Sequence, residues 1–158
     1  MLSDTHGHID TQIFEFLKSV DEVWHAGDIG DVDIFDGLVE DKQLRAVYGN
    51  IDDFRIRQDF PQVLIFNIEK IKVIMTHIGG YPNKYAPGIV QLLKKEKPNI
   101  FISGHSHILR VIYDKKLDLL HINPGAAGVN GFHKVRTMVR FIVDGKDIKD
   151  LEVWEQVR

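Results

Sequence analysis

Five separated segments of the sequence hold side chains that can bind metal ions, and each segment directly follows a short apolar stretch. The segments contain Asp4 with His6, Asp28, Asn50, His77, and His105 with His107. In a strand or the loop at its end, residues two apart point to the same side, so each closely spaced pair can chelate an ion. Carboxylate, amide and imidazole ligands together suit Mn, Fe, Ni, Zn or Co, whereas Ca prefers an all-oxygen shell. The sequence therefore predicts a transition-metal site at a set of strand ends.

Glycines precede three of these side chains. They are Gly27 before Asp28, Gly49 before Asn50 and Gly104 before His105. A residue without a Cβ lets the backbone turn sharply, which can bring the following ligands together. A single Asp or His of this kind is more often a hydrogen-bonded or solvated residue than a ligand, so it is the joint pattern that favours metal binding.

Helices and strands alternate in the first half of the chain. Apolar spacing predicts helices at Ile9–Lys18, with Asp10 or Thr11 as cap, and at Val32–Glu40. Short apolar runs predict buried strands at Glu22–His25 and Leu44–Tyr48. This alternation is typical of a parallel sheet, which binds ligands outside the carboxyl ends of its strands. The first three groups of candidate ligands fall at those ends.

The second half begins with an antiparallel pattern. Val63–Ile68 and Ile71–Thr76 read as a hairpin, Gly88–Lys97 as a helix that Pro98 stops, and Asn99–Ser103 as the next strand. Four further β-type runs follow, with Asp144-Gly145 as a turn between the last two: Leu109–Tyr113, Leu117–Ile122, Thr137–Val143 and Ile148–Trp154. We expect two packed sheets with helices outside.

The start of the chain is unusual for this pattern. A Ser-Asp-Thr-His run usually follows a buried strand, and only Met1–Ser3 precede the aspartate here. We expect a first strand that is clipped or whose start is misassigned, so that Met1–Ser3 are already paired in the middle of a sheet rather than fraying.

Composition sets broad limits on the class of protein. The 158 residues favour a single domain over 1–158, and 44% hydrophobic with 27% charged residues is typical of a globular protein. The chain has no cysteine, which excludes disulfide scaffolds and thiolate metal sites. It has no secretory leader pattern and no stretch long enough to span a membrane, so we expect a cytoplasmic protein without a membrane partner. A net charge of −3 favours small anionic esters over nucleic-acid polymers as substrates.

Together the motifs resemble those of the calcineurin-like metallophosphoesterases over most of the chain. The shared motifs, in order, are SDTHG, Gly27-Asp28, Gly49-Asn50, the isolated His77 and GHSH at 104–107. The short length and Asn123-Pro124-Gly125 look closest to the small bacterial and archaeal phosphodiesterases of that superfamily. The resemblance implies an α/β fold, a four-layer α/β/β/α sandwich.

The resemblance also implies a role for each candidate ligand. One metal would be held by Asp4, His6 and His107, the second by Asn50, His77 and His105, and Asp28 would bridge both. The implied cofactors are two divalent ions, manganese first, with Ni, Fe, Zn or Co as alternatives. Two such ions about 3.5–4 Å apart share a hydroxide and polarise a phosphoryl group. Asp28, Asn50 and His77 would then be the catalytic residues.

One position departs from the motif. The family often has a histidine after the asparagine of the third motif, which can protonate the leaving group, but here the residue is Ile51. Such proton transfer is commonly worth about 10²- to 10⁴-fold, so its loss affects esters with poor leaving groups most.

The function that follows is a metal-dependent phosphodiesterase acting on a small diester. Two alternatives are a phosphomonoesterase and a non-catalytic scaffold, because the resemblance also reaches retromer scaffold subunits of the same fold. Homo-oligomerisation is a further expectation from relatives, whereas the sequence does not identify the substrate.

Four other residues have surroundings in the sequence that indicate their role less specifically. We expect His25 to lie in a buried strand or behind the ligands, and Asp52 either to orient Asn50 or to cap its turn. Arg57 is expected to be a surface charge, and His133 to lie in a solvated loop.

Overall fold

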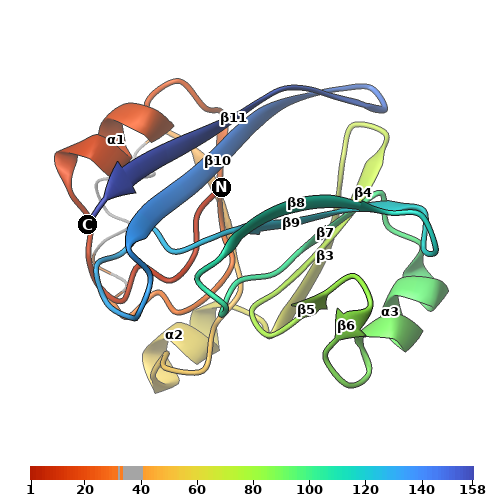
Figure 1. Ribbon diagram of the computed structural model, residues 1–158, viewed down its shortest axis with the longest axis horizontal. Helices are drawn as coiled ribbons and strands as arrows, with labels where there is room; N and C mark the ends of the chain where they lie inside the picture. Colours follow the sequence, from red (N-terminus) through yellow and green to blue (C-terminus); the bar gives the residue numbers. More distant parts are fainter. Residues whose placement is uncertain (32, 34–40) are drawn as a thin grey trace.

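The computed structural model describes residues 1–31, 33 and 41–158, and the helix expected at Val32–Glu40 lies outside them. Two β-sheets face each other and helices cover their outer faces (Figure 1). This arrangement agrees with the two packed sheets and outer helices expected from the sequence pattern.

The first sheet contains parallel and antiparallel parts joined by the start of the chain. β1 (Glu22–His25) and β2 (Gln43–Ala46) are parallel, and β10 (Val135–Asp144) and β11 (Asp147–Val157) form a long antiparallel ribbon. Residues 1–3 lie between these parts. Leu2 bridges to His25, and the Val139 amide donates to the Met1 carbonyl at 3.1 Å. The prediction that Met1–Ser3 are paired in the middle of a sheet is confirmed.

The second sheet has the strand order β3-β4-β7-β9-β8. Its strands are β3 (Val63–Ile68), β4 (Ile71–Thr76), β7 (Ile100–Ile102), β9 (Leu119–Pro124) and β8 (Leu109–Asp114). The three central strands are parallel, and the hairpin partners β3 and β8 are antiparallel edges. The parallel core places the carboxyl ends of β4 and β7 side by side, and His77 and His105 follow these ends.

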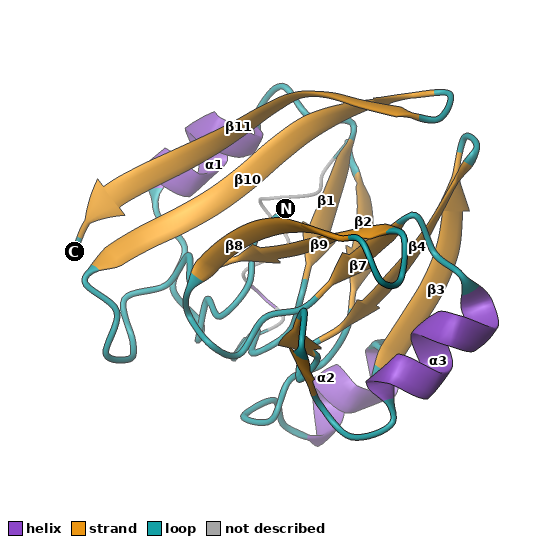
Figure 2. Cartoon of the chain, turned by 45° about the vertical axis from the view of Figure 1, so that its right-hand side comes forward, coloured by secondary structure: helices purple, strands orange, loops and turns teal. Residues whose placement is uncertain are grey.

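Three described helices lie outside the sheets (Figure 2). α1 (Thr11–Leu17) begins at Asp10, whose carboxylate accepts from two amides of the first turn, as a cap should. α3 (Ile89–Glu96) is the helix expected before Pro98. α2 (Phe54–Asp59) was not predicted, because six mostly polar residues show no apolar stripe. The strands β5 (Gly80–Tyr81) and β6 (Lys84–Tyr85) were not predicted either, because two residues are too few to show an alternating pattern.

Three hydrophobic clusters fill the spaces between four layers. Alternating residues of one strand enter different clusters: Val23 packs with α1, whereas Trp24 packs between the sheets. In the second sheet, Val73 faces the first sheet and Ile74 faces α3. The order is thus helix, sheet, sheet, helix, and the expected α/β/β/α sandwich is confirmed.

Several strand limits differ from the sequence pattern. β10 and β11 are longer than predicted, because their ladder continues past both predicted ends, out to Val135 paired with Val157 and to Asp144 paired with Asp147. β2 ends at Ala46, and the Tyr48 amide leaves the ladder to donate to the Pro61 carbonyl at 3.1 Å. None of the described helices is long and apolar enough to cross a membrane.

Candidate metal centre

The candidate ligands lie on loops that are hydrogen-bonded to one another through their backbones. The Asp4 amide donates to the Gly27 carbonyl at 2.9 Å, and the His6 amide to the Asp28 carbonyl at 3.0 Å. The Gly104 amide donates to the His77 carbonyl at 3.0 Å. The His105 amide also donates to Asp4 Oδ2 at 3.1 Å, so loops about 100 positions apart in the sequence meet at one edge of the two sheets.

Five of the seven candidate ligands have a left-handed backbone. Their φ angles are 54° at Asp4, 49° at His6, 54° at Asp28, 68° at His105 and 57° at His107. Each such residue without glycine's freedom costs about 1–3 kcal/mol, and strain of this kind concentrates at functional sites. The strand alternation assumed from the sequence does not apply to this backbone. His105 and His107 lie in different groups of ligands, as the resemblance to the superfamily implied, so the two-residue spacing does not make them one chelating pair.

The first group of ligand atoms comes from Asp4, His6 and His107, which lie within 4.8 Å of one another. His107 Nε2 is 3.1 Å from Asp4 Oδ1. Asp4 Oδ1 and His6 Nε2 are buried and have no hydrogen-bond partner among the described residues. Buried polar atoms are rarely left unpaired, so these two atoms fit a cation between them.

The second group comes from Asp28, His77 and His105, again within 4.8 Å. His77 Nδ1 is 2.8 Å from the Ala26 carbonyl, which can only accept, so Nδ1 carries the proton and Nε2 faces the site. His77 Nε2 is 3.1 Å from Asn50 Oδ1 and 3.3 Å from Asp28 Oδ1. Asn50 therefore joins this group.

Asp28 lies between the two groups. Its Oδ1 faces His77, whereas its Oδ2 is 3.9 Å from His6 Nε2 in the first group. Burial would raise the pKa of Asp28, but the hydrogen bond from His77 outweighs this and lowers the pKa. Burial would likewise lower the pKa of His77, but Asp28 and Asp4 raise it. The Asp28 carboxylate is thus ionised, and each of its two oxygens is directed at a different group of ligands.

Two glycines permit the close approach of the loops. A Cβ on Gly49 would lie 2.0 Å from Asp28 Oδ1 and 2.3 Å from the Asp28 amide nitrogen. A Cβ on Gly104 would lie 2.1 Å from Ser3 Oγ. Any larger residue would push the ligand loops apart.

Two charged residues hold the Asn50 loop from behind. Asp52 accepts from the Gly30 amide at 2.8 Å and from the Gly49 amide at 2.7 Å, so it fixes the turn rather than the Asn50 amide. Arg57 donates to the carbonyls of Asp52 and Asn50 at 2.7 and 3.1 Å. Arg57 is exposed, as expected of a surface charge, but its guanidinium also holds this turn. No sequence spacing signals that role, because α2 itself was not predicted.

Two further histidines lie behind the ligands. His25 is fully buried, its Nδ1 accepts from the Gly27 amide at 3.2 Å, and burial lowers its pKa to about 3. This confirms the buried-strand expectation. His133 lies in an exposed loop, as expected, but its own side chain is partly buried. Its ring is 5.0 Å from that of His107, with the two Nδ1 atoms 3.1 Å apart. Burial lowers the pKa of His133.

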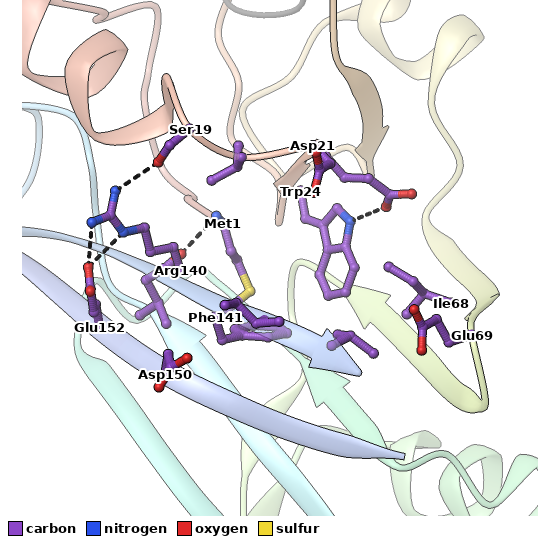
Figure 3. A pocket seen from close by; sticks show the side chains of 15 residues that line it. Met1, Ser19, Asp21, Trp24, Ile68, Glu69, Arg140, Phe141, Asp150 and Glu152 are labelled. Carbon is purple, nitrogen blue, oxygen red and sulfur yellow. Dashed lines mark hydrogen bonds and ion pairs between the residues drawn. The ribbon is translucent and has the colours of Figure 1, made fainter. Parts of the chain in front are cut away.

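A cavity of about 440 Å³ lies elsewhere, at the amino ends of β1 and β4 (Figure 3). Met1, Trp24 and Phe141 form its apolar walls. Its charged lining is mostly acidic and consists of Asp21, Glu22, Glu69, Asp150 and Glu152 with one basic residue, Arg140. Such a lining repels a phosphate ester. A smaller cavity of about 100 Å³ adjoins the metal centre and includes His105 and Arg110.

Comparison with known proteins places the chain in a family. The family model of the calcineurin-like phosphoesterase superfamily domain matches residues 1–146, so the protein belongs to this superfamily. A probable metallophosphoesterase of Methanocaldococcus jannaschii is 30% identical over 135 residues, which cover 82% of this chain and 67% of the relative.

Solved structures show the same fold. An archaeal phosphodiesterase has a TM-score of 0.75 at 22% identity, with 99% of this chain and 97% of that chain covered. Vps29 from Entamoeba histolytica, complexed with zinc, has a TM-score of 0.74 at 15% identity, with coverage of 99% and 96%. The two ligand groups and the superfamily together indicate a site for divalent metal ions.

Proposed function

We propose that the protein is a dinuclear metal-dependent phosphodiesterase that hydrolyses a small phosphate diester. The observation that supports this most directly is the pair of ligand groups with Asp28 between them. An archaeal phosphodiesterase of the same fold supports the choice of a diester.

In this proposal Asp4, His6 and His107 hold one ion and Asn50, His77 and His105 hold the other, with manganese as the first choice. The mixed oxygen and nitrogen donors suit Mn, Fe, Co, Ni or Zn. Two bound ions would activate water and polarise the phosphoryl oxygens for in-line displacement.

The protein's own groups prepare the site for this chemistry. Asp28 stays ionised and offsets the repulsion between two cations. The Ala26 carbonyl accepts from Nδ1 of His77 and so turns Nε2 toward the site, where the amide oxygen of Asn50 lies beside it. Ile51, whose side chain is 46% exposed, follows directly and has no proton to give. The leaving group must therefore depart without help from this position.

The proposed substrate is small rather than polymeric. A net charge of −3 opposes the broad attraction that nucleic-acid polymers need. The single domain, the cytoplasmic location and the possible homo-oligomer stay predictions.

The test is a metal-reconstitution assay. Protein stripped with a chelator and reloaded with Mn²⁺ is expected to hydrolyse bis(4-nitrophenyl) phosphate faster than 4-nitrophenyl phosphate. The stripped protein without Mn²⁺ is expected to hydrolyse neither ester. Faster hydrolysis of the monoester would favour a phosphomonoesterase and contradict the proposal.

A non-catalytic binding protein is the second candidate, favoured by the likeness to Vps29 structures. It predicts that protein loaded with two metal ions hydrolyses none of the aryl or alkyl phosphates. The same assay, with bound metal counted, separates the two candidates.

A further inference from the structure

His133 lies outside the seven candidate ligands and contacts one of them. Its Nδ1 is 3.1 Å from His107 Nδ1, and its Nε2 is 3.0 Å from the Gly128 carbonyl. Both rings are partly buried, and they meet edge to face at 5.0 Å. Since an imidazole nitrogen either donates or accepts, these contacts restrict the position of the protons.

The Gly128 carbonyl can only accept, so Nε2 of His133 carries a proton. In the neutral ring, Nδ1 of His133 is then an acceptor. The His107 Nδ1 that faces it must donate, which leaves the lone pair of His107 on Nε2. That nitrogen is the one 3.1 Å from Asp4 Oδ1, in the first ligand group.

The loop that carries His133 is tightly placed against His107. A Cβ on Gly131, whose φ is +120°, would lie 2.5 Å from His107 Nδ1. Arg158 donates to the Gly131 carbonyl at 2.6 Å and so ties the loop to the end of β11. Phe132, between Gly131 and His133 in the sequence, is fully exposed. The loop therefore turns the imidazole of His133, and not the neighbouring ring, toward the site.

We propose that His133 is a positioning residue that fixes the tautomer and ring orientation of His107, so that Nε2 of His107 is available to a metal ion. The inference rests on the metal centre of the proposed function and not on its reaction. Partners of this kind behind a metal-bound histidine typically change metal affinity by about 10- to 100-fold.

Two substitutions separate positioning from packing. His133→Phe keeps the ring and removes the acceptor, whereas His133→Asn loses the ring but keeps an oxygen where Nδ1 was. If His133 positions His107, isothermal titration with Mn²⁺ will show one of two sites weakened about 10- to 100-fold in His133→Phe. His133→Asn will then retain most of the affinity. A role in packing alone predicts the opposite order of the two variants, and that order would overturn the inference.

Phe132→Ala is the matched control in the same loop, and it is expected to leave both affinities unchanged. A second measurement needs no variant: ¹⁵N correlation spectra of the imidazoles in the metal-free protein should show His107 protonated at Nδ1. Protonation at Nε2 would overturn the inference even if a variant failed to fold. Wild-type protein that binds two ions without hydrolysing any ester would contradict only the proposed function.

Discussion

The two ends of the sandwich differ in how their polar groups are satisfied. At the cavity end, Glu22 accepts from Trp24 and Arg45 at 2.7 Å, and Arg140 donates to Glu152 at 2.7 Å (Figure 3). At the metal end, Asp4 Oδ1 and His6 Nε2 are buried without a partner among the described residues. The larger cavity is thus at the end where Glu22, Arg140 and Glu152 already have partners. Unsatisfied buried atoms locate the chemistry here better than cavity size does.

The two ends also differ in how many residues have a left-handed backbone. Five ligands at the metal end have positive φ angles, whereas the lining of the cavity has two such residues besides glycine, Glu69 and Asp150. Asp52 braces one ligand loop, because it accepts from the Gly30 amide two residues after Asp28. Strained residues persist only where surrounding contacts determine them. The metal end is therefore expected to respond strongly to small changes, and the cavity end weakly.

The largest effect is expected from Asp28→Asn. The amide removes the charge between the two ligand groups, so both ions should bind weakly and turnover should fall on the order of 10³-fold or more. Metal content and the rate of bis(4-nitrophenyl) phosphate hydrolysis measure this. Retained activity would show that Asp28 is not the bridge.

Gly49→Ala should come next. The added Cβ would meet the Asp28 backbone 2.3 Å away, so the two loops must separate, at a cost of about 1–3 kcal/mol in the free energy of unfolding. We also expect metal affinity to fall by about 10- to 100-fold. Gly88→Ala is the control. An alanine is strained at the φ of +83° found at Gly88, but nothing lies within 4 Å of the added Cβ. Loss of metal affinity in both variants would show that stability alone controls binding.

Ile51→His tests the missing proton donor. The wild type should hydrolyse aryl diesters much better than alkyl ones, because departure depends on the acidity of the leaving alcohol. The histidine should flatten the dependence of rate on leaving-group pKa, with a gain of up to about 10²-fold on poor leaving groups. Equal slopes for the two proteins would mean that another group delivers the proton or that chemistry is not rate-limiting.

The smallest effect is expected from Asp150→Asn, which makes the same chemical change as Asp28→Asn at the cavity end (Figure 3). Asp150 is exposed and has a φ of 49°, a conformation that asparagine tolerates. Metal affinity and rate should stay within about twofold, since exposed substitutions rarely exceed about 0.5 kcal/mol. A large loss of activity would mean that the two ends are coupled and would remove the contrast between them.

The sequence alone determined the layers of the fold and the ligand types. Apolar periodicity and turn residues are local properties, so they indicated β1, α3 and the β3–β4 hairpin, and Asp10 as a cap. The ligands could be predicted because each follows a strand, and parallel strands bring their carboxyl ends to one edge. The ends of β10 and β11 and the short helix α2 could not be predicted, because apolar residues show no regular period there.

Only the tertiary structure decided which residues support the ligands. The division of His105 and His107 between two groups was already implied by the resemblance to the superfamily. His133 meets His107 across 26 residues, and Arg57 reaches back to the turn at Asn50. Such contacts depend on how loops from different strands pack together, and the spacing of residues along a chain carries no record of that packing.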